Sequence, residues 1–400
     1  MTRQPGLDVP APVRVLMVME ATIGGTKRHL LELATGLHKL GCEVSIACPR
    51  IRNESHGDTS FWDDASGAGI PVIELPMERG VWSPTNLVAV RHLAVLLRRH
   101  RYDVVHAHSS IGGAVTRIAA QIVPRSMRPK VVYTPHGFAF LAGSAVRRNM
   151  FRLIERLLGL VTDRMIAVSP TEADVAVEHG VVPRDRVVAI PNGIDPSVMP
   201  GPEHRDDVRA REGWGDAPVV MTVARMTPQK DPGTWLRVAA RIAAACADVR
   251  FVWVWGGDQQ EMVKAEATRL GLSGRIDFLG YREDARELVS ASTVFLLTSR
   301  FEGLPYVLVE ALAMQVPVVA TDVTGTRDVV RHGVTGLLAP VEDVEALAAH
   351  VLSILDDRER GVAIGLAGKR DVEDRFSIAQ MVSHTLETYR DVLHQGSNRR

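Results

Sequence analysis

The sequence is poor in cysteine, in aromatic residues and in long apolar runs. It has three cysteines in 400 residues, too few for a disulfide framework and typical of a reducing compartment. The longest stretch without a charged residue, 131–146, has 16 residues and is interrupted by Pro135, so it falls short of the ~20 apolar residues that a membrane-spanning helix needs. The N-terminus lacks the basic-then-apolar order of a signal peptide. We therefore expect a cytoplasmic protein without a membrane span.

The net charge is zero, but the two halves of the chain differ in their balance of basic and acidic residues. Residues 1–195 contain 23 Lys and Arg against 18 Asp and Glu, whereas the remainder contains 24 against 29. Within 79–156 there are 13 basic residues and two acidic ones, Asp103 and Glu155. Such a segment attracts anionic lipid, nucleic acid or an acidic substrate, but a solvated helix surface rich in arginine explains it equally well.

The sequence is rich in short apolar runs that alternate with amphipathic stretches. Apolar residues make up 46% of the chain, and 400 residues are too many for a single core. Strands are expected at 13–19, 43–47, 71–75, 103–107, 130–134, 164–168 and 187–190, and, after a break, at 219–223, 250–254, 275–279, 294–297 and 317–320. Apolar strands separated by helices indicate parallel sheets covered on both faces, so we predict an α/β protein with two doubly wound domains.

The break between the two series, 191–216, contains four prolines and four glycines, which predicts a linker. We place an N-terminal domain at 1–195 and a C-terminal domain at 196–375. Ligands of such sheets bind at the carboxyl ends of the strands, so the expected site is the cleft between the domains.

The most informative segment is 299–313, where an expected strand is followed by a loop and a helix. Pro305 stands at the expected helix start, whose free backbone amides suit an anion, and Gly303 allows close approach of a ligand. Glu302 in the loop and Glu310 on the helix suit recognition of sugar hydroxyls. The simpler interpretation is that these are an acid at a helix start and a glutamate on the surface, with no ligand.

Two further segments carry groups suited to phosphate. Arg225 and Lys230 follow the strand at 219–223 and can converge on one point. Gly24-Gly25, after the first strand, lets the backbone approach a phosphate. Taken alone, the first segment can be an exposed pair of cations that binds nothing, and the second can be a simple tight turn. The third glycine of G-x-G-x-x-G is missing, which disfavours a nicotinamide oxidoreductase.

Histidines stand at two expected strand ends. His136, between Pro135 and Gly137, is placed to reach into the cleft and bond a hydroxyl or stabilise charge. A structural turn histidine is the competing interpretation. His106 and His108 alternate along one strand and share one face, but no third ligand lies nearby in sequence, so we do not expect a metal site.

Taken together, these segments resemble the family-four retaining glycosyltransferases of the GT-B fold, over nearly the whole chain. Glu302 and Glu310 match the family's two glutamates with seven residues between them, and Arg225 and Lys230 match its Arg-x4-Lys diphosphate pair. The glycine-rich first loop and the His-Gly of the acceptor domain are matched as well. The resemblance implies two Rossmann-like domains that face a central cleft, with the N-terminal domain binding the acceptor. It also implies a last helix, within 376–400, that crosses back to that domain.

The resemblance implies a donor site for a nucleotide-sugar. Arg225 and Lys230 would neutralise the leaving diphosphate, with help from the backbone amides of Gly303 and Leu304. Glu310 would bind the ribose hydroxyls.

It also implies roles at the sugar. Glu302 would hold hydroxyls of the donor sugar, and His136 would contact the sugar and the transition state. Gly24 and Gly25 would close over the phosphates from the opposite domain. Relatives generally need no metal or other cofactor and transfer with retention by front-face attack. UDP is the expected nucleotide and GDP the second choice.

A basic amphipathic segment suggests where the acceptor comes from. Arg147, Arg148, Arg152 and Arg156 recur at near-helical spacing among apolar residues, which suits a helix resting on anionic lipid. We expect a peripheral protein on the inner face of the membrane that uses a glycan or lipid-linked acceptor in polysaccharide, exopolysaccharide or glycolipid synthesis, without a nucleic-acid partner.

Two other functions fit the same architecture. A nucleotide-sugar epimerase would also bind a nucleoside diphosphate, although the paired cations and glutamates fit transfer better. A non-catalytic nucleotide-sugar-binding protein is the second alternative, and it would not need every group that stabilises a leaving diphosphate.

Overall fold

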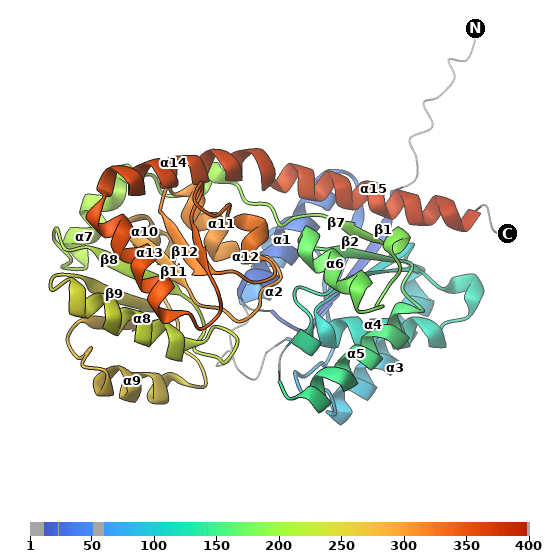
Figure 1. Ribbon diagram of the computed structural model, residues 1–400. Helices are drawn as coiled ribbons and strands as arrows, with labels where there is room; N and C mark the ends of the chain where they lie inside the picture. Colours follow the sequence, from blue (N-terminus) through green and yellow to red (C-terminus); the bar gives the residue numbers. More distant parts are fainter. Residues whose placement is uncertain (1–11, 23, 51–59, 142, 398–400) are drawn as a thin grey trace, which may run out of the picture.

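The structure is a computed structural model that describes residues 12–22, 24–50, 60–141 and 143–397, and a parallel sheet lies at the centre of each half (Figure 1). The N-terminal half contains β1 (Arg14–Met19), α1 (Gly24–Lys39), β2 (Glu43–Cys48), α2 (Ser60–Gly67), β3 (Val72–Glu74), α3 (Pro84–His100), β4 (Val104–His108), α4 (Ser110–Ile122), β5 (Lys130–Thr134), α5 (Ala145–Gly159), β6 (Arg164–Ala167), α6 (Pro170–Glu178) and β7 (Val187–Ala189). The C-terminal half contains α7 (Arg205–Arg211), β8 (Val219–Val223), α8 (Pro232–Ala245), β9 (Arg250–Val254), α9 (Gln260–Arg269), β10 (Ile276–Gly280), α10 (Ala285–Ser290), β11 (Val294–Leu297), α11 (Tyr306–Ala313), β12 (Val318–Thr321), α12 (Thr326–Val329), β13 (Leu337–Ala339), α13 (Val344–Asp356), α14 (Arg358–Arg375) and α15 (Ile378–Ser397).

Both sheets have the strand order of a doubly wound fold. The first runs β3-β2-β1-β4-β5-β6-β7, the second runs β10-β9-β8-β11-β12-β13, and all neighbouring strands are parallel. The order reverses between β1 and β4 and again between β8 and β11. Such reversals open a crevice at the carboxyl ends of the strands, where ligands bind. The predicted α/β fold with two doubly wound domains is confirmed.

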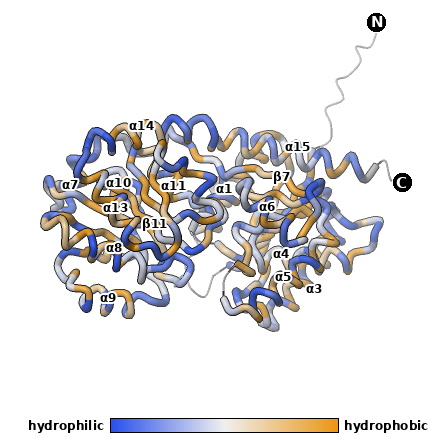
Figure 2. Tube along the Cα trace, viewed as in Figure 1, coloured by the Kyte–Doolittle hydropathy of each residue, from blue (hydrophilic) through white to orange (hydrophobic). Residues whose placement is uncertain are grey.

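Each central strand is buried on both faces because its side chains alternate between two helix layers. In β1, Val15, Met17 and Met19 pack into one core, and Leu16 and Val18 pack into the core on the opposite face. The strands are accordingly the apolar centre of each domain in Figure 2, with polar segments outside. This is why the strands read as unbroken apolar runs in the sequence.

Helix α15 extends from the C-terminal half onto the N-terminal half, and with α14 it runs along the top of both (Figure 1). Leu386 and Tyr389 of α15 belong to the core that contains β1 and α1. Gly36 of α1 faces Val382 so closely that a Cβ there would lie 2.4 Å from Val382 Cγ2. The small residue lets the two helices approach.

The structure differs from the sequence predictions at three places. Helix α7 lies within the predicted linker, because Val208 and the following Trp214 are buried in the core of the second domain. Helix α1 begins at Gly24, so the glycine pair forms its first turn and does not precede it. The three-residue strand β13 was not expected, since its run is too short to show a pattern. Of the helices that the structure describes, none is both long and apolar enough to cross a bilayer.

Candidate active site

A cavity of about 250 Å³ lies where the two sheet edges face each other. Its lining includes Gly24, Gly25 and His136 from the first domain and Arg225, Lys230 and Glu302 from the second. These residues follow the carboxyl ends of β1, β5, β8 and β11, next to the points where the strand order reverses. The fold thus brings together six residues from four segments that are far apart in the chain.

Lys230 and Glu302 form an ion pair in this cavity. Lys230 Nζ lies 2.5 Å from Glu302 Oε1, and the Ser299 hydroxyl donates to the same oxygen at 2.5 Å. The Glu302 side chain is only 7% exposed. A carboxylate this deeply buried needs such partners, because an unpaired buried charge is strongly destabilising.

The two loops that carry this pair are joined by their backbones. The amide of Arg300 donates to the Gln229 carbonyl at 2.8 Å, and the Thr298 hydroxyl donates to the Lys230 carbonyl at 3.1 Å. Asp231 then caps α8, accepting from the Thr234 amide at 3.2 Å. These bonds hold Lys230 at a set position relative to the loop that precedes α11.

Gly303 lies in a close backbone contact between the two domains. A Cβ at Gly303 would be 2.9 Å from the His136 carbonyl carbon and 3.0 Å from the Gly137 amide nitrogen. The side-chain amide of Asn192 donates from Nδ2 to the Leu304 carbonyl at 3.3 Å, also across the cleft. Only glycine allows this approach, which places the amides before α11 beside the histidine loop.

His136 is held in an unusual backbone conformation, with φ of 55°. The Gly137 amide donates to Glu172 Oε1 at 2.6 Å, and the Val168 amide donates to Glu172 Oε2 at 2.8 Å. Burial raises the pKa of Glu172 to about 7, although these two amides favour its ionised form. Glu172, which sequence reasoning missed, therefore fixes the loop that presents His136.

Two family models match the chain, one in each domain. The model described as Glycosyl transferase 4-like domain matches residues 24–193, and the model described as Glycosyl transferases group 1 matches residues 204–371. The alpha-maltose-1-phosphate synthase of Mycolicibacterium smegmatis is 30% identical over 396 residues, which cover 92% of this chain and 96% of that relative. The chain is a group 1 glycosyl transferase.

Other relatives of the transferase agree with this assignment. The UDP-Gal:alpha-D-GlcNAc-diphosphoundecaprenol alpha-1,3-galactosyltransferase of Escherichia coli is 27% identical, with 91% of this chain and 96% of the relative covered. The structure of Anabaena HepE in complex with UDP-glucose superposes with a TM-score of 0.79 at 22% identity, covering 94% of this chain and 99% of the other. Sucrose-phosphate synthase from Thermosynechococcus elongatus superposes with a TM-score of 0.82 at 20% identity, covering 96% of this chain and 100% of the other. These likenesses confirm the predicted GT-B fold.

Glu310 of the transferase does not line the cavity, in contrast to Glu302. Its carboxylate pairs with Arg28 of α1 and, at 2.7 Å, with Arg286 of α10, and its side chain is 14% exposed. Glu32, one turn after Arg28, joins the same network. The glutamate that we expect to bind ribose is thus already engaged by arginines from both domains.

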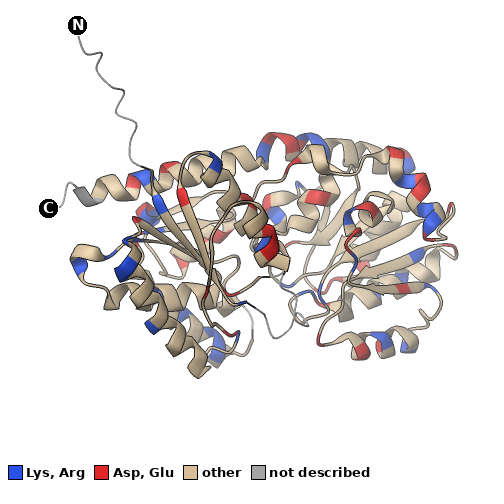
Figure 3. Ribbon diagram, turned by 180° about the vertical axis from the view of Figure 1, so that it is seen from behind, with Lys and Arg blue, Asp and Glu red and all other residues tan. Residues whose placement is uncertain are grey.

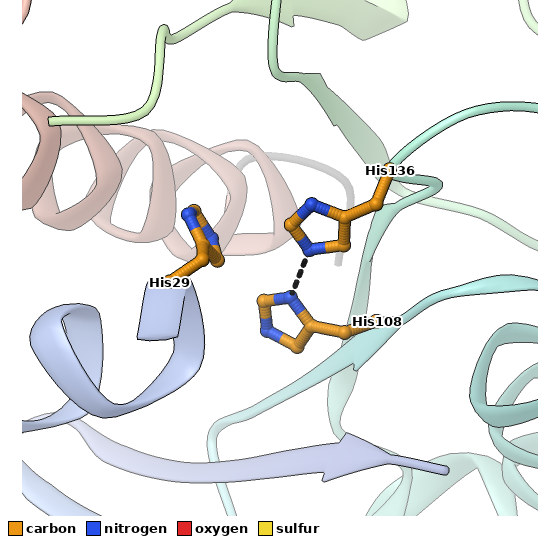
Figure 4. A group of neighbouring side chains, drawn as sticks. All are labelled: His29, His108 and His136. Carbon is orange, nitrogen blue, oxygen red and sulfur yellow. Dashed lines mark hydrogen bonds between the residues drawn. The ribbon is translucent and has the colours of Figure 1, made fainter. Parts of the chain in front are cut away.

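His136 of the transferase is one of three clustered histidines from different elements (Figure 4). His29 comes from α1, His108 ends β4, and His108 Nδ1 lies 3.2 Å from His136 Nε2. Burial lowers the pKa of His29 to about 4 and places the pKa of the other two well below the usual range, with added repulsion from neighbouring imidazoles. All three are therefore neutral at physiological pH.

From the sequence, the pair of histidines weighed as metal ligands was His106 and His108, not the cluster of three. His106 and His108 do share one face, with ring centroids 4.1 Å apart, but His106 is occupied by the Tyr389 hydroxyl at 2.7 Å and by Thr134 at 2.8 Å. The residue that sequence reasoning missed is His29, four residues after Gly25 on α1. That spacing, one helical turn beyond the glycine pair, is the signal that was available.

The four predicted basic residues lie apart from the cavity, on α5. Arg147, Arg148 and Arg156 are exposed and Arg152 is half-buried. Helix α5 follows His136 in the chain, with a 3₁₀ turn at Ala139–Leu141 between them. In Figure 3, the helices at the lower left, which belong to the N-terminal domain, show more blue than red.

Proposed function

We propose that the transferase moves a hexosyl unit, with retention, from a UDP-sugar to a lipid-linked glycan acceptor. The observation that carries this proposal is the cavity in which Arg225, Lys230 and Glu302 face the glycine turn of α1. Two cations and a carboxylate in one cavity suit a ligand that has both a diphosphate and sugar hydroxyls.

The departing diphosphate is stabilised by the second domain. Arg225 and Lys230 supply positive charge. Gly303 and Leu304, which also line the cavity, directly precede α11, whose N-terminal dipole favours an anion. These groups take the place of a metal ion at the diphosphate. Stabilising the charge that develops on a leaving group contributes about 3–4 kcal/mol for one preorganised donor.

The donor sugar lies between Glu302 and His136. Lys230 and Ser299 occupy one oxygen of Glu302, so the carboxylate is oriented for hydroxyls by its other lone pairs. The neutral His136 ring donates or accepts a hydrogen bond from the opposite domain. Front-face attack then lets the leaving phosphate take the acceptor proton, and the anomeric configuration is retained.

Uridine is the base that the comparisons favour. The superposed Anabaena structure contains UDP-glucose, and the Escherichia coli relative is named for UDP-Gal. Trp255 lines the cavity after β9, with its ring edge-to-face against Tyr281 at 5.0 Å. An aromatic side chain there offers the base a stacking surface.

The acceptor is lipid-linked because α5 has the features of an interfacial helix. Val146, Leu153, Leu157 and Leu160 are 81%, 57%, 58% and 75% exposed and recur at helical spacing. The arginines of α5 flank this apolar stripe, as anionic lipid requires. Because α5 follows the His136 loop, a membrane bound there lies next to the acceptor side of the cleft. The transferase is then a peripheral protein on the cytoplasmic face.

Donor binding is tested with a thermal-shift panel of UDP-, GDP-, ADP- and dTDP-sugars. A ligand at 100 times its Kd adds about 2.7 kcal/mol, which raises the melting temperature by several degrees. A shift with UDP-sugars alone supports the proposal, and a shift confined to another nucleotide overturns the UDP assignment. Transferred or hydrolysed sugar supports transfer, whereas epimerised sugar would assign the epimerase reaction.

Membrane association is tested by sedimentation with liposomes rich in anionic lipid at low salt. The wild type should sediment with them, and Leu153→Ser/Leu157→Ser should lose most of the binding. Absence of wild-type binding would reject the peripheral location but not the donor assignment.

A further inference from the structure

Three ring nitrogens in the histidine cluster lack a hydrogen bond of good geometry. Among the residues that the structure describes, these are both ring nitrogens of His29, whose polar neighbour is the Asn192 side chain, and His108 Nε2. His29 and His108 are almost fully buried, with exposures of 3% and 0%. A buried polar atom without a partner costs about 1–3 kcal/mol, so a ligand that engages a ring nitrogen of His29 would relieve part of this cost.

The geometry of the cluster suits a metal ion. One nitrogen from each of His29, His108 and His136 lies within 4.8 Å of the others. The 3.2 Å between His108 Nδ1 and His136 Nε2 is close to the ~3.3 Å between two nitrogens that each lie ~2.0–2.1 Å from a tetrahedral zinc ion. The three rings converge from a helix, a strand end and a loop, as Figure 4 shows.

The chemistry of the donor set also fits. Neutral imidazole is the form that binds metal, and imidazole favours Zn²⁺, Cu²⁺ and Ni²⁺ over Mg²⁺ and Ca²⁺. The rings are supported from behind, since His106 packs against His108 and is itself held by Tyr389 and Thr134. This packing holds the His108 ring in place. His136, unlike His29 and His108, also lines the cavity.

We propose that His29, His108 and His136 bind one Zn²⁺ ion, and that the bound ion closes the sugar end of the cavity. The ion holds the His136 ring, through the nitrogen that faces His108, away from the donor sugar, so zinc inhibits transfer. The site belongs to the N-terminal domain, opposite the cations that bind the diphosphate. Zinc binding stands on the geometry alone, and the inhibition rests on the proposed function.

Binding is tested on the full chain, free of affinity tags and stripped with a chelator, by calorimetric titration with Zn²⁺. We expect one ion per chain and at least about 100-fold weaker binding in His29→Asn, since loss of an outer partner alone costs up to that much. His38→Asn is the matched control, because His38 is exposed on the same helix, and it should bind as the wild type does. No binding, or equal binding in wild type and His29→Asn, overturns the proposal.

A spectrum keeps the test decisive if His29→Asn does not fold. Co²⁺ added to the wild type should give the intense visible absorption of a tetrahedral site, and added Zn²⁺ should abolish it. His108→Asn should show no such absorption. A Co²⁺ spectrum of octahedral type, or one that zinc leaves unchanged, rejects the site.

Competition separates the two parts of the proposal. Bound Zn²⁺ should weaken UDP-sugar binding in the wild type and in His38→Asn. UDP-sugar binding that is unaffected by bound zinc rejects the closing of the cavity. Zinc binding by a protein that binds no UDP-sugar leaves the metal site intact and rejects the proposed function.

Discussion

The two domains present different chemistry to the same cleft. The C-terminal domain contributes ionised groups, with Lys230 and Glu302 paired at 2.5 Å and Arg225 on the same cavity. The N-terminal domain contributes glycine backbone and histidines that burial keeps neutral. Under the proposed function, the ionised groups of one domain compensate the charge of a diphosphate, and the other domain offers uncharged donors and acceptors to hydroxyl groups.

The largest effect should come from removing a cation from the charged side. Lys230→Ala should lower kcat/KM for the UDP-sugar by about 100–1,000-fold, because it deletes one group that stabilises the leaving diphosphate. Steady-state kinetics measures this, and Arg241→Ala, which breaks an exposed ion pair of the same domain, is the control. Activity of Lys230→Ala within a factor of a few of the control would contradict our assignment of charge to this domain.

In the N-terminal domain, whose histidines are neutral, we expect the largest effect to be a change in the free energy of unfolding with pH. The pKa of Glu172 rises from 4.5 to about 7 on folding, so the folded chain binds more protons than the unfolded chain between these pH values. The free energy of unfolding therefore falls as pH rises through this window, by about 3 kcal/mol for this one group.

Comparison of the wild type with Glu172→Gln isolates that contribution. Urea unfolding at several pH values should show the stability of the wild type relative to the variant declining between pH 4.5 and 7, while all other groups cancel. Parallel stability curves for the two proteins would show that Glu172 titrates normally.

The contact between the two sides is tested by adding one methyl group. Gly303→Ala places a Cβ 2.9 Å from the His136 backbone, so the domains must separate at a cost of about 1–3 kcal/mol. We expect about a tenfold loss in kcat/KM with little change in melting temperature, since opening the cleft relieves the clash. Gly233→Ala is the control, because its nearest neighbour would be 3.8 Å away. Equal activities of the two variants would show that closure is not required.

The smallest effect concerns the arginine that links the domains through Glu310. In Arg28→Gln the carboxylate keeps Arg286 at 2.7 Å but loses its partner from α1. If Glu310 binds ribose, the nucleotide no longer has to displace Arg28, whose side chain is 16% exposed, and UDP should bind about 2–5-fold more tightly. Calorimetric titration measures this. Weaker UDP binding would mean that Arg28 itself contacts the nucleotide.

Much of the site was predictable because it lies at strand ends that apolar runs mark in the sequence. Arg225, Lys230 and Glu302 each follow such a run closely, and parallel strands bring their carboxyl ends to one edge. The ion pair between Lys230 and Glu302 was not predictable, since 72 residues separate them. Nor was the engagement of Glu310 by Arg28, which depends on how the domains face each other.

By itself, the sequence determined the α/β class, the two doubly wound sheets and the strand-end loops that carry the charged residues. Those features depend on local apolar periodicity and on short-range glycine and proline preferences. The tertiary structure alone decided that His29 joins His108 and His136, that Glu172 fixes the histidine loop and that Gly303 touches the opposite domain. These contacts join segments that are distant in the chain, and their existence depends on the relative position of two domains, which no local pattern records.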